Sequence, residues 1–216
     1  MKNITKLSAL LLIAGIVLAN NTLIAAAAGG GAVVNKAAIA AAMRGPESSA
    51  AKIIVTKISD LPTLHRAAYN GNIDHLKTAL DSGADINATF DMTRGDGQQD
   101  IDITALHLAT KFGGFDAVKI LLERGALIDK TYDIIFPDEE MATGLTALHD
   151  AAEFCTTKII SLLLANNANP NRRYERIYSD GTEVKGMTPF ELAKERAKPE
   201  VLAVFTEAAK RRQLKK

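Results

Sequence analysis

Apolar residues recur at helical spacing in short blocks along residues 61–210, and polar stretches separate the blocks. In the second block of each unit the apolar side chains stand three and four positions apart, as in Val118, Leu121 and Leu122, which predicts one buried helix face. The first block opens with Thr or Pro, which suit a helix start, and contains Ala residues that let helices approach closely. Each unit therefore predicts two short helices packed against each other.

The blocks return with a fixed step. Leu64, Leu106, Leu148 and Phe190 stand 42 residues apart, and several other columns keep this step. Self-similarity at a fixed period is the signature of a protein built from stacked repeats. The columns are His65, His107 and His149 with Glu191 in fourth place; Gly83, Gly125 and Asn167; Ala84, Ala126 and Ala168; and Asn87, Asp129 and Asn171.

Glycines mark the predicted ends of the helices. Gly71 and Gly113 are expected to end the first helix of their units in the left-handed conformation, which Gly adopts without strain. Gly83 and Gly125 end the second helix. Asn167 takes that place in the third unit, because Asn is the usual substitute for Gly at positive φ.

These units resemble ankyrin repeats, whose signature T-P-L-H-x-A is followed by a second helix and G-A-D-x-N. The segments "PTLHRAAYNG", "TALHLATKFGG", "SGADIN" and "NNANPN" carry the resemblance, which covers three full repeats and a divergent fourth. It implies an all-α repeat solenoid of helix-turn-helix units with extended β-hairpin fingers. Residues 61–87, 104–129, 146–171 and 188–210 would form the repeats, residues 88–103, 130–145 and 172–187 the fingers, and residues 211–216 a basic tail.

The repeated Thr and His residues are scaffold in this resemblance, which implies that they hydrogen-bond within and between turns. Stacked helices lie roughly 10 Å apart, so the three His side chains are too widely spaced to share one metal ion. No catalytic residue, cofactor or metal site is therefore assigned to this column.

The fingers are copies of one another. The usual ankyrin period is about 33 residues, so each unit carries roughly nine more, and Asp-Gly pairs predict hairpin tips. Aromatic residues share one column and acidic residues two others. The aromatic residues are Phe90, Tyr132 and Tyr174, and the acidic ones are Asp91, Asp133 and Glu175, followed by Asp96, Asp138 and Asp180.

Two interpretations of these columns stay open. The aromatic residues are either anchors for a partner or a packed row that stiffens the fingers. The acidic side chains, which dominate the first two fingers, either attract a basic partner or only solvate the hairpins. Phe112 and Phe154 form another column, with Tyr69 one residue earlier in its own unit. The resemblance implies that this position faces a concave groove and varies with the partner, and packing between repeats is the alternative.

The N-terminus predicts export. Lys2 and Lys6 precede an apolar run over residues 7–19, and small residues follow at 25–31, as in a signal peptide of residues 1–28. Cleavage near Ala27 or Ala28, or at Ala19, fits this pattern. An uncleaved membrane anchor over residues 7–28 and a coincidental apolar tail are the alternatives. Residues 29–60 are expected to be a linker that ends in a capping helix, because apolar residues recur at helical spacing over residues 53–58.

Composition excludes several other classes. The formal net charge is +1, so no general attraction to nucleic acid is expected. The single cysteine, Cys155, excludes an intramolecular disulfide and a thiolate zinc cluster. No catalytic motif is present, and Cys155 and His149 lie six residues apart across a helix and its turn, so they are not expected to form a nucleophile and base.

The sequence therefore predicts an exported, non-enzymatic module that binds a protein partner, possibly a basic one, through its concave face and fingers. Nucleic acid is not expected as a partner, and a membrane only if the N-terminal segment stays uncleaved. A membrane-tethered scaffold or stress-protection factor in the cell envelope, and a secreted effector acting on host proteins, are the alternatives. The expected partner-binding residues are Tyr69, Phe90, Asp91, Asp96, Phe112, Tyr132, Asp133, Asp138, Phe154, Tyr174, Glu175 and Asp180.

Overall fold

The computed structural model of the chain describes residues 54–55, 61–154, 156–196 and 199–213. The chain divides into two compact units, Met1–Ala51 and Lys52–Lys216, and every described residue belongs to the second. The predicted signal peptide, most of the linker and Cys155 lie outside the described residues.

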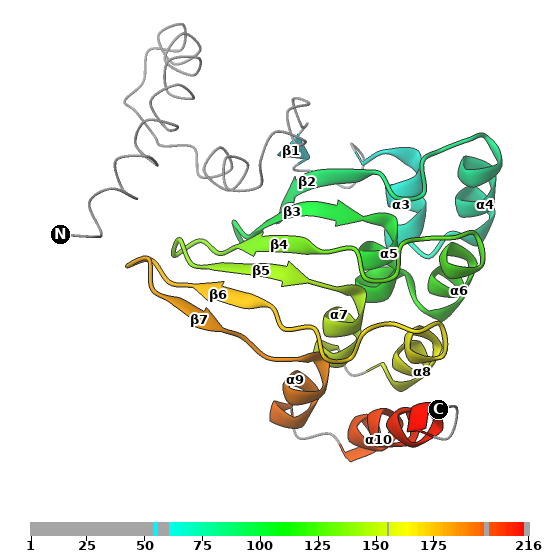
Figure 1. Ribbon diagram of the computed structural model, residues 1–216. Coiled ribbons are helices and arrows are strands. Elements are labelled where there is room, and N and C mark those ends of the chain that lie inside the picture. Colours follow the sequence, from blue (N-terminus) through cyan, green and yellow to red (C-terminus); the bar gives the residue numbers. More distant parts are fainter. Residues whose placement is uncertain (1–53, 56–60, 155, 197–198, 214–216) are drawn as a thin grey trace, which may run out of the picture. The chain divides into compact units, whose positions relative to one another are not determined.

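Helices come in pairs that stack in two rows (Figure 1). The inner row consists of the first helix of each unit, and the outer row consists of the second, which agrees with the predicted helix pairs. The inner helices are α3 (Thr63–Tyr69), α5 (Ala105–Leu108) continued by the π-helical turn η3 (Ala109–Gly113), α7 (Ala147–Glu153) and α9 (Pro189–Glu195). The outer helices are α4 (Ile73–Asp81), α6 (Phe115–Glu123), α8 (Thr157–Ala165) and α10 (Pro199–Gln213).

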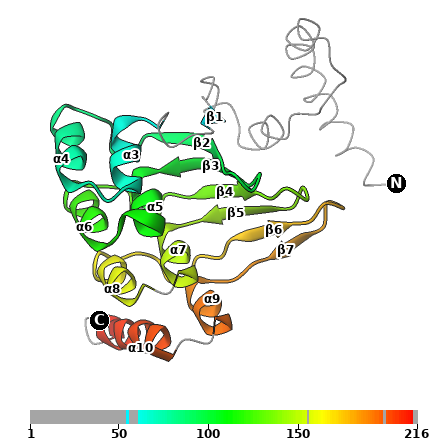
Figure 2. The ribbon, with the colours of Figure 1, turned by 180° about the vertical axis from the view of Figure 1, so that it is seen from behind.

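The three fingers form antiparallel hairpins, as the sequence predicts, but they also hydrogen-bond to one another (Figures 1 and 2). One sheet results, with its strands in chain order. The predicted repeat solenoid is present, but the description of it as all-α is not confirmed, because the lengthened connections pair edge to edge and add a continuous sheet beside the inner helices. The strands are β2 (Thr89–Thr93), β3 (Gln99–Thr104), β4 (Tyr132–Ile135), β5 (Met141–Leu145), β6 (Glu175–Ile177) and β7 (Glu183–Lys185).

A further strand precedes the repeats. β1 (Ile54–Val55) pairs in parallel with β2, in the register Ile54 with Asp91 and Val55 with Met92. The capping helix predicted over this segment is therefore wrong at the two positions that the structure describes. Instead of packing as a helix, this segment pairs through its backbone with β2. The pairing covers one edge of the sheet.

The core lies between the two helix rows and extends to the ends of the hairpins that adjoin the helices. Leu64, Leu106 and Leu148, the residues that set the repeat register, are all buried. Side chains of the Asn87 column connect successive units, since Asn87 Oδ1 accepts the amide of Leu127 at 2.8 Å and Asp129 Oδ1 accepts the amide of Asn169 at 3.0 Å. The repeat step in the sequence is thus matched by a repeated hydrogen bond between neighbours.

Helix ends follow the sequence in all but one place. Gly71, Gly83, Gly125 and Asn167 have positive φ, at 62°, 85°, 90° and 67°, which confirms those predictions. The prediction for Gly113 is wrong: the π-helical turn extends to Gly113, and Gly114 takes the positive φ instead, at 83°. Gly113 is needed for a different reason, because a Cβ there would lie 1.9 Å from the backbone oxygen of Ala68 in the neighbouring unit.

We expect Gly113→Ala to lower the free energy of unfolding by more than about 2 kcal/mol, because backbone must move to admit the methyl group. Gly125→Ala is the matched control. It also replaces a repeat glycine, but no atom lies within 4 Å of the new Cβ, so only the strain of positive φ remains, at about 1 kcal/mol. Urea unfolding followed by circular dichroism measures both, and equal losses would contradict the close contact between units.

Candidate functional site

The histidine column joins each inner helix to the hairpin that follows it. In the second unit the Nδ1 of His107 lies 3.2 Å from the backbone N and 2.8 Å from the Oγ1 of Thr104, and its Nε2 lies 2.9 Å from the carbonyl oxygen of Lys130. His149 repeats the contacts with Thr146, but its Nε2 lies 3.3 Å from the carbonyl oxygen of Met187, which follows the last strand of the hairpin. The scaffold role expected for these residues is confirmed.

The first unit departs from this arrangement for a chemical reason. Pro62 occupies the place of Thr and has no N–H to donate, so the buried Nδ1 of His65 has no hydrogen-bond partner. Its Nε2 still lies 3.0 Å from the carbonyl oxygen of Ala88. Burial lowers the pKa of His107 to about 3 and that of His149 to about 4, so both rings are neutral at pH 7 and bond as neutral imidazoles.

The aromatic column packs on the histidine column. The rings of Phe90 and His65 lie 4.6 Å apart, and those of Tyr132 and His107 lie 4.7 Å apart. Phe90 is only 6% exposed and Tyr132 only 1%, so both rings are packed within the protein, and their role in binding a partner stays a prediction. The alternative interpretation is a row of aromatic rings packed on each other. The rings are packed, but on the histidine rings rather than on each other. Tyr174, which faces His149 at 5.8 Å, is only partly buried.

Two of the predicted acidic residues hold β-bulges together. Asp91 Oδ1 accepts the amide of Asp102, and Asp133 Oδ1 accepts the amide of Gly144, each at 2.9 Å. Both amides belong to residues with positive φ beside an irregularity in strand pairing. These two carboxylates therefore stabilise the hairpins through internal hydrogen bonds. Glu175, on β6, is exposed.

The second acidic column lies at the hairpin tips. Asp96, Asp138 and Asp180 accept the amide two residues further on, at 3.0, 3.3 and 2.8 Å, and all three are exposed. Such a bond shapes the turn and leaves the negative charge in solvent. The tips thus carry a row of negative charge, and its role in binding stays a prediction.

A groove of about 680 Å³ runs between the hairpin sheet and the inner helices. Its walls include Tyr132, Tyr174, Phe136 and Arg176 from the hairpins and Phe154 at the end of α7. Phe154 is 49% exposed, as expected for a residue facing the groove. The other two residues expected there, Tyr69 and Phe112, do not line it: their rings pack on each other at 4.5 Å.

A cluster of charged side chains forms the floor of the groove, and the sequence analysis missed it. Lys111, 3% exposed, places its Nζ 3.6 Å from Asp100 Oδ1 and 3.6 Å from Asp150 Oδ1. Arg94 bonds both oxygens of Asp100, at 2.8 and 3.0 Å, and the hydroxyl of Tyr132 donates to Asp150 Oδ1 at 2.6 Å. Within the sequence, the signal was that Asp150 stands where the preceding unit has Leu108.

The electrostatics of the cluster are governed by burial. Desolvation raises the pKa of Asp150 to about 6, although the charge of Lys111 and the hydrogen bond from Tyr132 oppose the shift. The pKa of the Tyr132 hydroxyl is raised well above its usual value by burial and by the charges of Asp150 and Asp100. The tyrosine therefore stays protonated and acts as a donor.

Within the described part of the chain, no group of three or more His, Cys, Asp or Glu side chains is placed to hold a metal ion. Over the same residues, no helix is both long enough and apolar enough to cross a bilayer. A family model described as "Ankyrin repeats (3 copies)" matches residues 64–174. No curated protein matches the chain.

Removal of Lys111 should be strongly destabilising, because Asp150 would lose its nearest cation while remaining buried. We expect Lys111→Met to lower the free energy of unfolding by about 3 kcal/mol. Lys119→Met is the control: Lys119 forms an exposed pair with Glu123, so its loss should change the free energy by less than about 1 kcal/mol.

A double-mutant cycle separates the ion pair from simple packing. Asp150→Leu restores the residue type of the preceding unit and removes the carboxylate. The double variant Lys111→Met/Asp150→Leu should therefore be more stable than Lys111→Met alone, as measured by urea unfolding. Additive losses would contradict coupling between Lys111 and Asp150.

Proposed function

The chain belongs to the ankyrin-repeat family, and we propose that it is a non-enzymatic module that binds a protein partner in the groove between its hairpin sheet and inner helices. Ankyrin repeats are protein–protein interaction modules. The observation that carries the proposal is the composition of the groove: at several positions its lining residues change in character from one unit to the next.

Three columns illustrate this change. Lys111 stands where the next unit has Glu153, and both line the groove. Asp150 replaces Leu108, which is fully buried. At the hairpin ends, Arg94 gives way to Phe136, and both border the groove. Side chains that change from unit to unit on a repeated scaffold give such a groove a surface specific to one partner.

We further propose that the partner is basic on the surface that faces the first two hairpins. Asp96 and Asp138 carry exposed negative charge at those tips. Asp91 and Asp133 contribute less to the attraction of a basic partner than the sequence suggests, because their carboxylates accept hydrogen bonds from amides at the β-bulges. Charges at the rim of a binding surface act mainly on the rate of association and on its salt dependence.

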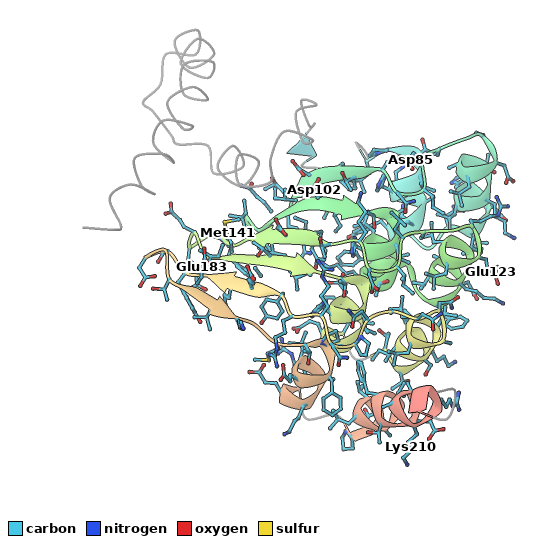
Figure 3. The ribbon with its side chains drawn as sticks, in the orientation of Figure 1. Asp85, Asp102, Glu123, Met141, Glu183 and Lys210 are labelled. Atoms are coloured by element: carbon cyan, nitrogen blue, oxygen red, sulfur yellow. The ribbon has the colours of Figure 1, made fainter. Side chains whose placement is uncertain are left out.

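Site-specific photo-crosslinking in the native cell tests this function. With p-benzoylphenylalanine in place of Phe154, we expect discrete adducts of the chain with one protein or a few. The control position is Glu123, which lies on the outer helix row, away from the sheet (Figure 3). Adducts of equal yield from both positions, or from Glu123 alone, would show that the groove is not the binding surface.

The charge of the tips is tested in the same experiment. Asp96→Asn/Asp138→Asn keeps the side-chain oxygen that accepts the turn amide but removes both charges. We expect this pair to lower the adduct yield from position 154 several-fold at low salt, and less at high salt. An unchanged yield would remove the basic-partner proposal and leave the groove proposal standing.

Export is a separate proposal, supported by the Lys2 and Lys6 flank and the apolar run over residues 7–19. The native protein from fractionated cells should have an intact mass that corresponds to a chain beginning near Gly29, in an exported soluble fraction. A full-length chain in the membrane fraction would indicate an anchor over residues 7–28 and a tethered scaffold. A full-length chain in the cytosol would overturn export.

A further inference from the structure

The groove holds one of its own cations between an aromatic ring and carboxylates. The Nζ of Lys111 lies 4.4 Å from the centre of the Tyr132 ring and 3.6 Å from each of two carboxylate oxygens, on Asp100 and Asp150. The face of an aromatic ring attracts a cation, and the attraction grows when water is excluded. Ring and carboxylate thus act together on the same ammonium group.

A second cation of the groove is held in the same way. The guanidinium of Arg176 lies 5.7 Å from the Phe136 ring and 5.6 Å from the Tyr178 ring. Its Nη2 donates to Glu140 Oε2 at 2.7 Å. The combination of ring and carboxylate is therefore a recurrent means by which these walls hold a positive charge.

Asp150 forms a further combination of this kind with Phe154, in which Lys111 lies nearest to one carboxylate oxygen, Oδ1. Asp150 and Phe154 stand four residues apart at the end of α7, so their side chains lie on one face. Asp150 Oδ1 accepts from Tyr132, but Asp150 Oδ2 has no hydrogen-bond partner, and the residue is only 4% exposed. Phe154 is half-exposed at the groove, and among the described residues no Lys or Arg lies over its ring.

An unpartnered buried carboxylate oxygen is unfavourable, and a donor supplied by a ligand removes that penalty. The charge of the Asp150 carboxylate favours a cationic donor over a neutral one. The four cationic side chains that line the groove, Arg94, Lys111, Arg176 and Arg196, are each engaged by a carboxylate.

We propose that this place in the groove is a subsite for a basic side chain of the protein partner, whose cationic group donates to Asp150 Oδ2 beside the ring of Phe154. The inference rests on the proposed function and specifies what the groove recognises. The aliphatic stem of a lysine or arginine would pack on Tyr174, Met187 and Leu192, which line the same groove. An anionic group is disfavoured there, because it would meet the Asp150 carboxylate.

The test uses the full-length chain and two small probes, N-acetyl-arginine amide and its neutral analogue N-acetyl-citrulline amide. Calorimetric titration at pH 7.5 should show saturable binding of the arginine probe, with a Kd on the order of millimolar. The citrulline probe should bind about tenfold more weakly, because it retains donors but lacks the charge.

Two variants test whether the arginine probe binds at Asp150 and Phe154. Asp150→Asn should weaken the arginine probe about tenfold, and Phe154→Ala, which leaves the carboxylate in place and alters a half-exposed side chain, about threefold. Glu123→Gln removes a like charge on the outer helix row and should leave the Kd unchanged (Figure 3). Thermal melts report whether Asp150→Asn folds, and Phe154→Ala keeps the test decisive if it does not.

Three results would overturn the subsite. These are the absence of saturation by the arginine probe, equal affinity for the citrulline probe, and an unchanged Kd in both groove variants. None of them removes the proposed function, because crosslinking from position 154 reports partner binding independently of arginine. Conversely, arginine binding without any crosslinked partner would leave a cation subsite in a groove that does not bind protein.

Discussion

The hydrogen bonds of the buried histidines fix the geometry on which the rest of this molecule depends. In the second and third units, Nδ1 accepts the Thr amide that opens an inner helix, so Nε2 carries the proton and donates to a carbonyl at the root of the following hairpin. In the second unit this neutral side chain joins a helix start to the start of a hairpin, and in the third it joins a helix start to the end of the hairpin. Burial keeps His107 neutral, which holds this donor and acceptor pattern at physiological pH.

Repetition of this connection explains why the hairpins form a sheet. Each histidine connects its hairpin to its own inner helix, and the stacking of helices brings neighbouring hairpins within pairing distance. The aromatic column then packs on the histidine rings, so the ring of Tyr132 is buried where the hairpin meets the inner helix. The sheet and the inner helices diverge beyond this joint, and the groove lies between them.

Features governed by local chemistry could be predicted from the sequence, and features governed by distant contacts could not. Asn167 at positive φ and the Asp-Gly hairpin tips follow from the preferences of single residues. The pairing between hairpins depends on the stacking of whole units. The acidic residues of the hairpins look alike in sequence, yet Asp91 bonds a bulge, Asp96 caps a tip and Asp100 is buried beside Lys111. The side chain that each carboxylate meets is supplied by another segment of the chain.

Comparison of the units distinguishes residues that hold the repeats together from residues that are particular to one unit. A residue that recurs in three units, such as His107, makes contacts that each of these units uses to join its inner helix to its hairpin. A polar residue that appears once, such as Asp150 in place of Leu108, is not required by stacking and brings a desolvation penalty into the core. Lys111 offsets only part of that penalty, since Asp150 Oδ2 still has no hydrogen-bond partner. The buried charge of Asp150 stands in place of a leucine, so packing between units does not call for it, and it lies in the groove for which partner binding is proposed.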